Sequence, residues 1–466
     1  MSARGRLWAT SNHPFVMARK RKTKVQVVHT QIRPDVAAVD VGAREIYAAV
    51  PPSATDQPVR AFPTFTDDLR ALVRWLQSFG IKSVAMEATS VYWIPLAELL
   101  EEAGIEVCLV NPRHVKNVPG RKSDVMDCQW LQYLHSVGLL RAAFRPDAEV
   151  RSLRTLWRHR DGLVRRACWQ TQHVHKALDQ MNVQIHHVLS DINGETGTAI
   201  VQAILSGERD PAVLAKHRDP RVKASEDTLR KALSGDYRPD LLFCLRQAFE
   251  GYQFTRQQIA DTDAELERQM RLLAPVQDAA SERPQKSVSK TGPQFNNAAL
   301  LRAINGVDLC TVPGISNLTA QTVWCELGGD ISAFPTIKHF TSWLGLSPDN
   351  RISGGKPLSS FTQRTNNRVA RALRLAAQGL HHAKNELGDH YRRLRAKLGG
   401  KAANTAMAHK LARIIYVMLT RRVPYRPELH SASGDAQRAR TLKYLTAKAK
   451  SLGLALVPDP LTSPVS

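Results

Sequence analysis

The chain has 466 residues, of which 43% are hydrophobic and 23% are charged, so it is long enough for two or three globular domains with buried cores. Its 65 Lys and Arg residues outnumber 42 Asp and Glu residues, and the resulting net charge of +23 indicates a polyanionic partner, nucleic acid rather than a membrane surface. No apolar run approaches the roughly 20 residues of a membrane-spanning helix, and no secretory signal is recognisable. The six cysteines show no Cys-x-x-Cys spacing, which argues against a zinc knuckle or a disulfide framework and indicates a reducing cytoplasm.

The N-terminal third predicts a mixed α/β domain behind a basic lead-in. Residues 1–30 lack hydrophobic periodicity and contain the basic run 19–24, which is typical of a flexible arm, although a localisation signal or a phosphate-binding tail has the same composition. Thr66 is the expected N-cap of the first helix and Gly80 its end. The pattern predicts, in order, three strands between residues 35 and 66, a helix at 69–79, a strand at 81–86, a helix at 91–103 and a strand at 105–110.

Two acids stand at the ends of strands, where apolar residues would pack. Asp40 ends the first strand, before Gly42, and Glu87 ends the strand at 81–86. Burying a carboxylate is costly unless a salt bridge, a metal ion or a metal-bound phosphate compensates for it. An Asp-x-Gly sequence after a strand is also an ordinary turn, so Asp40 alone does not identify a site.

Two further acids lie where the chain leads into a helix predicted at residues 128–137, for which Ser123 or Asp124 is a possible N-cap. Asp124 and Asp127 are three residues apart and share one helical face, where like charges repel unless a cation lies between them. Acids at a helix start also complement the helix dipole, which is an equally good explanation of this pair. Four acids on two strands and one helix of a single α/β unit nevertheless suit two Mg²⁺ ions about 4 Å apart, the arrangement used for in-line phosphoryl transfer.

The N-terminal half resembles the RuvC-like half of the DEDD transposases of the insertion-sequence 110 family. Its plan is closest to the 1111 subgroup, and the motifs that carry the resemblance are Asp40-Val41-Gly42, Met86-Glu87-Ala88-Thr89, Asn111-Pro112-Arg113, Lys122-Ser123-Asp124 and Asp127. The resemblance implies an RNase-H-like fold with a Mg²⁺-binding tetrad formed by Asp40, Glu87, Asp124 and Asp127. It also implies donor and target DNA as substrates, a non-coding bridge RNA, and assembly as a homodimer or homotetramer.

The middle of the chain predicts a long helical arm. Apolar residues recur at threes, fours and sevens from 148 to about 188, and a second helical pattern at 243–273 is a candidate for the returning half of a coiled coil. Residues 189–240 are less regular, with Asp210-Pro211 and Asp219-Pro220 as expected helix breaks. Packing explains Trp157, Trp169 and His173 better than stacking on bases does. The arginines, expected on other faces of the arm, favour nucleic-acid contact: Arg151, Arg154, Arg158, Arg160, Arg165 and Arg166.

The C-terminal part carries two candidate DNA-binding features. A helix at 300–304 and a second helix after the turn at Gly314 resemble a helix-hairpin-helix, in which backbone N–H groups contact a phosphate; an ordinary helical turn is the alternative. Ser353 precedes two glycines and Lys356 in an expected exposed loop. In the family that the chain resembles, the corresponding serine is the nucleophile that joins DNA, which makes Ser353 the candidate. Ser359 and Ser360 lack the following glycines.

Seven residues are the expected nucleic-acid contacts: Arg121, Lys122, Gly314, Lys356, Arg364, Arg368 and Arg371. Tyr416 lies in an apolar helix at 405–420 and is expected in the core. The predicted domains are a basic arm (1–30), a RuvC-like catalytic domain (31–147), a helical coiled-coil arm (148–274), a linker (275–297), a mostly α-helical transposase domain with the nucleophilic serine (298–427), and a partly disordered basic tail (428–466).

Together with these residues, the family resemblance implies a site-specific transposase or recombinase of a mobile element, bacterial, cytoplasmic and nucleoid-associated, that acts through two Mg²⁺ ions and a covalent phosphoserine. A RuvC-like junction endonuclease that hydrolyses DNA with water, without a role for Ser353, is the alternative. An actin-like ATPase also uses Asp-x-Gly in a hairpin, but no second phosphate loop is recognisable. A non-catalytic nucleic-acid-binding protein would require the four acids to be incidental.

Overall fold

The structure, a computed structural model, describes residues 32–88, 90–112, 124–274, 291–359, 361–427 and 434–457. The chain forms two compact units, Met1–Arg145 and Pro146–Ser466. The predicted basic arm at 1–30 and the positions of Arg121 and Lys122 lie outside the described residues. Within the described part, no helix combines the length and the apolar character needed to cross a bilayer.

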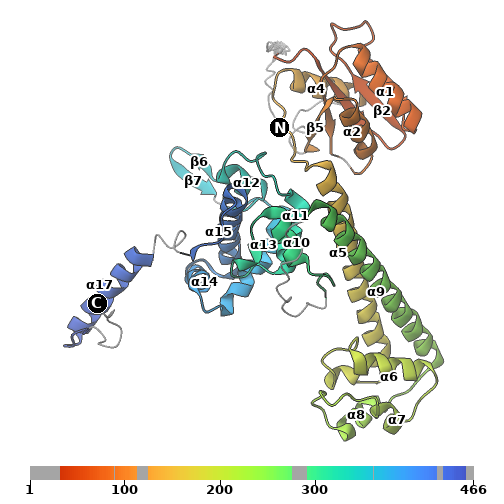
Figure 1. Ribbon diagram of the computed structural model, residues 1–466, viewed down its shortest axis with the longest axis vertical. Coiled ribbons are helices and arrows are strands. Elements are labelled where there is room, and N and C mark those ends of the chain that lie inside the picture. Colours follow the sequence, from red (N-terminus) through yellow and green to blue (C-terminus); the bar gives the residue numbers. More distant parts are fainter. Residues whose placement is uncertain are drawn as a thin grey trace, which may run out of the picture. The chain divides into compact units, whose positions relative to one another are not determined.

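The first unit is built on a five-stranded mixed sheet with the strand order β3-β2-β1-β4-β5 (Figure 1). An antiparallel meander forms one half, and β1, β4 and β5 run parallel in the other half. The predicted mixed α/β unit is therefore confirmed. Its elements are β1 (Val36–Val41), β2 (Glu45–Ala49), β3 (Val59–Pro63), α1 (Thr66–Ser78), β4 (Ser83–Glu87), α2 (Trp93–Glu102), β5 (Glu106–Val110) and α4 (Asp124–Ser136).

Side chains alternate between the two faces of the sheet and create two cores. Val39 of β1 and Met86 of β4 pack in the larger cluster, which includes the buried residues of α1 and α2. Ala38 and Ala85, their neighbours in sequence, point to the opposite face and pack with Leu131 of α4. The helix α4 therefore covers the face of the sheet opposite α1 and α2.

One helix start differs from the sequence prediction. Thr66 is the first residue of α1 and not its cap: the N-cap is Phe65, without a side-chain hydrogen bond, and the Phe65 carbonyl accepts the N–H of Leu69 at 2.9 Å. The helix α4 includes both Asp124 and Asp127, in agreement with the prediction that they share one helical face. Gly80 follows the end of α1 as predicted, with a left-handed φ of +65°.

The second unit begins with two long helices, α5 (Ala148–Gln180) and α9 (Pro239–Leu273), which pack side by side (Figure 1). At their far end, η1 (Ile185–His187), α6 (Glu195–Leu205), α7 (Pro211–Ala215) and α8 (Glu226–Leu233) share one apolar cluster with both helices. Asp210-Pro211 does not interrupt a helix here. It starts α7, because the Asp210 side chain accepts the N–H of Ala212 and Pro211 occupies the first turn.

The helix α5 corrects one sequence interpretation. Arg160 was expected on a polar face, but its side chain is only 2% exposed on the face that packs against α9. Its guanidinium pairs with Asp263 of α9 and donates to the carbonyls of Thr291 and Gly292. Trp157 is also buried, and its indole N–H lies 3.3 Å from the hydroxyl of Thr322, so it serves packing.

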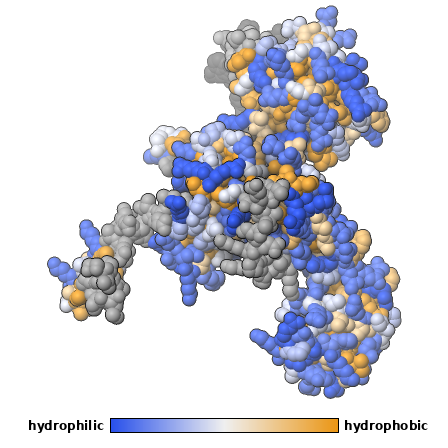
Figure 2. All heavy atoms as spheres, viewed as in Figure 1, coloured by the Kyte–Doolittle hydropathy of each residue, from blue (hydrophilic) through white to orange (hydrophobic). Residues whose placement is uncertain are grey.

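The rest of the second unit is mostly helical, and Figure 2 shows hydrophilic residues over much of the visible surface. Tyr416 is buried as predicted and donates to the Phe334 carbonyl at 2.8 Å. The described part of the tail contains a helix, α17. The elements are α10 (Asn297–Asn305), η2 (Leu309–Thr311), α11 (Asn317–Leu327), α12 (Ile337–Trp343), β6 (Arg351–Ser353), β7 (Lys356–Ser359), α13 (Arg368–Gly379), η3 (Leu380–His382), α14 (Glu386–Leu398), α15 (Gly400–Arg421) and α17 (Gly434–Ser451).

Candidate functional site

Asp40 and Glu87 lie next to each other in the sheet of the first unit. The strands β1 and β4 are parallel neighbours, and Val39 pairs with Met86, so the next residue of each strand is an acid. Strand alternation turns Asp40 to the side of Ala38 and Glu87 to the side of Ala85, which is the face covered by α4. Both acids are half-buried at the carboxyl ends of their strands.

The helix α4 is anchored to this face by a cysteine that sequence reasoning did not single out. The Cys128 thiol is buried and donates to the carbonyls of Ala38 at 3.2 Å and Tyr47 at 3.0 Å. Burial raises the pKa of Cys128 to about 12, and the negative charge of Asp40 contributes in the same direction. The thiol is therefore neutral and structural, and it lies close to Asp40.

Asp127 directly precedes Cys128 and is half-buried in the first turns of α4. The anchoring of Cys128 thus holds Asp127 near the end of β1. Asp124 lies one turn earlier on the same helix, and its side chain is outside the described residues. Two strands and one helix consequently place three of the four predicted acids, Asp40, Glu87 and Asp127, in one region of the first unit.

The donor set fits a divalent ion chemically, because carboxylate oxygens are the hard ligands that Mg²⁺ prefers. Among the side chains that the structure describes, no group of three or more His, Cys, Asp or Glu is close enough to hold a metal ion. The acidic site is thus a set of neighbouring carboxylates, and the tetrad, which includes Asp124, stays a prediction.

Ser353 lies on an ordered hairpin and not in an open loop. It ends β6 and pairs with Lys356 of β7, and Gly354 and Gly355 make the turn with left-handed φ values of +55° and +77°. Two glycines are what such a two-residue hairpin turn requires. Ser353 and Lys356 are both exposed, as predicted.

Exposed apolar side chains lie on the same hairpin and directly after it. Ile352, Leu358 and Phe361 are 64%, 70% and 84% exposed. The base of the hairpin is held by a bridge between Pro348 and Thr362 and by the Asp349 N–H, which donates to the Phe361 carbonyl at 2.9 Å. The hairpin therefore presents a hydroxyl between a lysine and exposed apolar groups.

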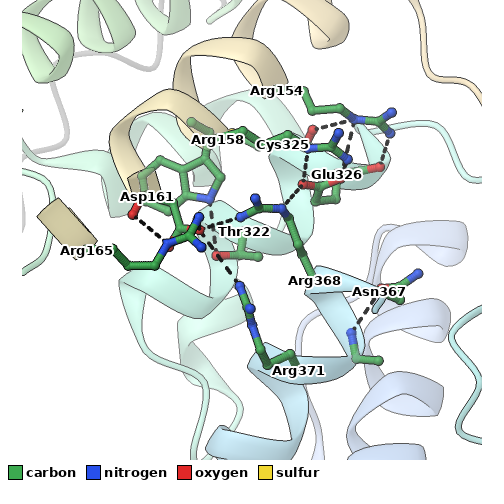
Figure 3. A network of polar contacts seen from close by, with 12 residues as sticks. Arg154, Arg158, Asp161, Arg165, Thr322, Cys325, Glu326, Asn367, Arg368 and Arg371 are labelled. Carbon is green, nitrogen blue, oxygen red and sulfur yellow. Dashed lines mark hydrogen bonds and ion pairs between the residues drawn. The ribbon is translucent and has the colours of Figure 1, made fainter. Parts of the chain in front are cut away.

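The predicted basic helix after the serine joins a network of ion pairs (Figure 3). Arg368 of α13 pairs with Asp161 of α5 and lies 3.8 Å from Glu326 of α11. Glu326 is 7% exposed on its side chain and accepts a bidentate pair from Arg158 at 2.6 and 2.9 Å. The network thus joins three helices of the second unit, and Arg368, predicted as a phosphate contact, has an internal role in it.

Positive charge exceeds negative charge in this network. Asp161 also accepts from Arg165 at 3.1 Å and lies 3.8 Å from Arg371, while Arg154 donates to the Glu326 backbone. The side chains of Arg165 and Arg371 are 65% and 62% exposed. Five arginines therefore share two carboxylates, which leaves charge available for an anion; the five are Arg154, Arg158, Arg165, Arg368 and Arg371. Arg364 is exposed ahead of α13.

Gly314 is explained by packing. Its φ is +89°, and a Cβ there would lie 3.0 Å from the Ala376 carbonyl oxygen and from Leu380 Cγ. The turn therefore fits closely against the end of α13, and Ser316 caps α11 by accepting the N–H of Thr319. These contacts account for the glycine without a phosphate, so its DNA contact stays a prediction.

Both units match known proteins. Residues 37–183 match a family model of IS110-type DEDD transposases, described as "Transposase". Residues 308–392 match a second model, described as "Transposase IS116/IS110/IS902 family". Over these two regions the chain is similar to the IS110 family of transposases. The family match indicates DNA transposase activity, and DEDD transposases generally use a divalent metal.

Two curated proteins are similar to this chain. The transposase for insertion sequence element IS1111A of Coxiella burnetii is 31% identical over 121 residues, which cover 25% of this chain and 33% of that protein. A probable family 20 transposase of Pseudomonas aeruginosa is 26% identical over 352 residues, which cover 74% of this chain and 86% of that protein. The resemblance stated from the sequence motifs, including the 1111 subgroup, is thus confirmed.

Proposed function

We propose that this chain is the transposase of an insertion sequence, a site-specific recombinase that cuts and rejoins DNA strands. The observation that carries the proposal is the placement of Asp40 and Glu87 side by side on β1 and β4, on the face where α4 brings Asp127. Carboxylates grouped at the carboxyl ends of strands suit phosphoryl transfer, because they hold divalent cations against a phosphate.

In this proposal Asp40, Glu87, Asp124 and Asp127 would hold the divalent cations, two Mg²⁺ ions. When bound, the cations neutralise charge on the phosphate and lower the pKa of an attacking hydroxyl. Cys128 keeps α4 and its acids in place, and its neutral thiol does not compete as a ligand.

Ser353 is the proposed nucleophile. Its hydroxyl gives up its proton, its oxygen attacks the phosphorus of a phosphodiester, and one strand leaves as a free hydroxyl while the other stays joined to the serine. Attack by a hydroxyl of a new strand on the phosphoserine then restores the phosphodiester and returns the serine. Bond energy is conserved in both steps, so the exchange needs no ATP. The exposure of Ser353 beside Lys356 supports this role.

The proposed partners are donor DNA, target DNA and a bridge RNA, bound by a homodimer or homotetramer in the cytoplasm, close to the nucleoid. The net charge of +23 supports a polyanionic partner. The proposed nucleic-acid contacts are Arg121, Lys122, Gly314, Lys356, Arg364, Arg368 and Arg371. The exposed side chain of Arg371 supports its assignment more strongly than the paired side chain of Arg368 supports its own.

A RuvC-like junction endonuclease is the second candidate. It is favoured by one observation: the acids and α4 form a self-contained arrangement within the first unit, whereas Ser353 belongs to the second. In that case water attacks the phosphodiester, and no covalent link to the protein forms.

The test is a search for a covalent protein–DNA adduct on a denaturing gel, with Mg²⁺, donor and target DNA and the transcript that flanks the element. Ser353→Ala and Asp127→Asn are expected to abolish the adduct. Ser359→Ala, on the paired strand of the same hairpin, and Asp56→Asn, in an exposed loop, are matched controls that should keep it. If DNA is cleaved without forming an adduct, and cleavage persists in Ser353→Ala, the protein acts as a RuvC-like endonuclease.

A further inference from the structure

A cavity of about 430 Å³ lies among α12, α14 and α15 of the second unit. Its lining combines apolar and basic side chains. The basic side chains are His390 of α14 and His409, Lys410 and Arg413 of α15, and the apolar ones are Ile337, Leu394, Ala406, Ile414 and Val417. No carboxylate is among these lining residues, so the cavity has an electrostatic preference for anions.

The basic groups are crowded and partly withdrawn from water. Burial lowers the pKa of His390, and the charges of Lys410 and Arg393 lower it further. Burial likewise lowers the pKa of His409, with Arg413 as the second cause. The pKa of Lys410 is lowered by burial and by Arg393 and Arg413, against the opposite effect of Glu386. An anion placed among these groups would relieve their mutual repulsion.

We propose that this cavity binds one unstacked nucleotide of a single-stranded nucleic acid, with its phosphate at Lys410, Arg413 and the two histidines and its base or sugar against the apolar lining. The proposal rests on the proposed function, which makes nucleic acid the partner. It adds a binding site on α14 and α15, away from the serine hairpin and from the arginine network.

Two observations favour a strand over a free anion. Inorganic phosphate would leave the apolar side of the cavity, including Leu394 and Ile414, without a partner. The two helices that supply the basic lining also carry exposed basic residues, Arg395 and Lys397 on α14 and Lys401 on α15, which offer further phosphate contacts. A chain of phosphates can follow such a path, whereas a single ion uses one point of it.

A single strand fits better than a duplex. The apolar lining is reached only by a base or sugar that leaves its stack, and unstacking is least costly in a strand without a complement. DNA and RNA strands carry the same phosphodiester, so the experiment compares a DNA oligonucleotide and an RNA oligonucleotide of one sequence, with the DNA duplex as a third arm.

The test measures oligonucleotide affinity by fluorescence anisotropy over a range of salt concentrations, without divalent metal. Lys410→Gln/Arg413→Gln removes two charges from the cavity. Lys216→Gln/Arg230→Gln removes two exposed charges, one at the C-cap of α7 and one in α8, and is the matched control. The cavity variant should bind single strands about tenfold more weakly and reduce the slope of log affinity against log salt by roughly 1 to 2, while the control matches the parent protein. Equal slopes for the cavity variant and the control would overturn the proposal.

A second variant keeps the test valid if the charge substitutions disturb folding. Burial holds the pKa of His390 and His409 below the ordinary value of roughly 6.5 in the free protein, and a bound phosphate raises it, so strand affinity should increase as the pH falls from about 7.5 to about 5.5. His390→Gln/His409→Gln should flatten this increase. An unchanged pH profile would contradict the proposal. Displacement of the strand by inorganic phosphate far better than by sulfate at equal ionic strength would also contradict it, because the cavity would then be a site for the free anion.

These measurements are independent of strand cleavage. Without divalent metal no strand is cut, so a failure here concerns the cavity alone. A missing covalent adduct, in contrast, would concern Ser353 and the acids.

Discussion

At the residue scale, His135 fixes the C-terminal half of α4 to the sheet. Its imidazole is 3% exposed, and its Nε2 lies 3.0 Å from the hydroxyl of Ser83 on β4. Burial lowers the pKa of His135 to about 4, and the positive charge of Arg33 adds to this effect. The ring is therefore neutral in the folded protein at neutral pH, and α4 depends on that neutrality.

We expect the first unit to lose stability as the pH falls from about 6.5 to about 4. The unfolded chain takes up a proton near the ordinary histidine pKa of roughly 6.5, whereas folded His135 does so only near 4, so protons favour unfolding in this window. Urea unfolding at several pH values measures the loss. His135→Gln, which can still bond to Ser83, should reduce the pH dependence; an unchanged profile would show that other groups control it.

Single residues also show where sequence reasoning stops. Asp40 and Glu87 were found because an acid at the end of an apolar run conflicts with the pattern around it. Cys128 and His135 fit a helical pattern without conflict, so nothing in the sequence distinguished them. Their roles depend on which carbonyl or hydroxyl the fold brings near them, and that is a matter of tertiary packing.

At the scale of elements, the hairpin β6–β7 depends on its turn. Gly354 and Gly355 both have left-handed φ values, which cost a residue with a side chain about 1–2 kcal/mol, least for Asn. We expect Gly355→Val to distort the hairpin and to reduce adduct formation at Ser353 by about tenfold, because Ser353 is then no longer held in its pairing with Lys356.

Gly354→Asn is the matched control, because Asn-Gly is a preferred pair in two-residue hairpin turns. It should form the adduct at the parental rate, and neither variant should change the melting temperature of the second unit. Equal adduct yields for both substitutions would mean that hairpin geometry does not position the serine.

The pairing of α5 with α9 depends on one buried ion pair. Arg160 and Asp263 are 2% and 3% exposed, and removal of the cation leaves a buried carboxylate without its charged partner. We expect Arg160→Met to cost about 3–5 kcal/mol, and Arg160→Met/Asp263→Leu to cost less, because no buried charge remains. Thermal unfolding measures both variants. Arg268→Met, on the exposed side of α9, should leave the midpoint nearly unchanged.

The sequence predicted which helices and strands form better than it predicted where they begin and which residues they contact. Hydrophobic periodicity gave the three-stranded meander, both parallel strands that follow it and the two long helices. It misplaced the start of α1, because a helix start is decided by backbone geometry at residues such as Phe65 and not by the nearest threonine. Arg160 was expected on a polar face of α5 because its partner, Asp263, lies 103 residues away in sequence.

At the scale of the whole molecule, the chain has two units with separate cores. The cluster around Met86 lies entirely in the first unit, and the cluster along α5 and α9 lies in the second. Units that bury their own apolar residues unfold as separate cooperative blocks unless a large interface joins them. Calorimetry should therefore resolve two transitions.

Two core variants assign those transitions. Met86 is fully buried in β4, and Met86→Ala should cost about 2–5 kcal/mol and lower one transition by on the order of 10 °C. Arg160→Met should lower the other transition, because its ion pair lies in the second unit. Acidification from about pH 6.5 should lower both transitions, because burial lowers the pKa of His135 in the first unit and of His390 and His409 in the second. His135→Gln should reduce the shift of only the transition that Met86→Ala moves. If both substitutions shift the same transition, the units unfold as one block, and the stability of the acidic site then depends on the whole chain.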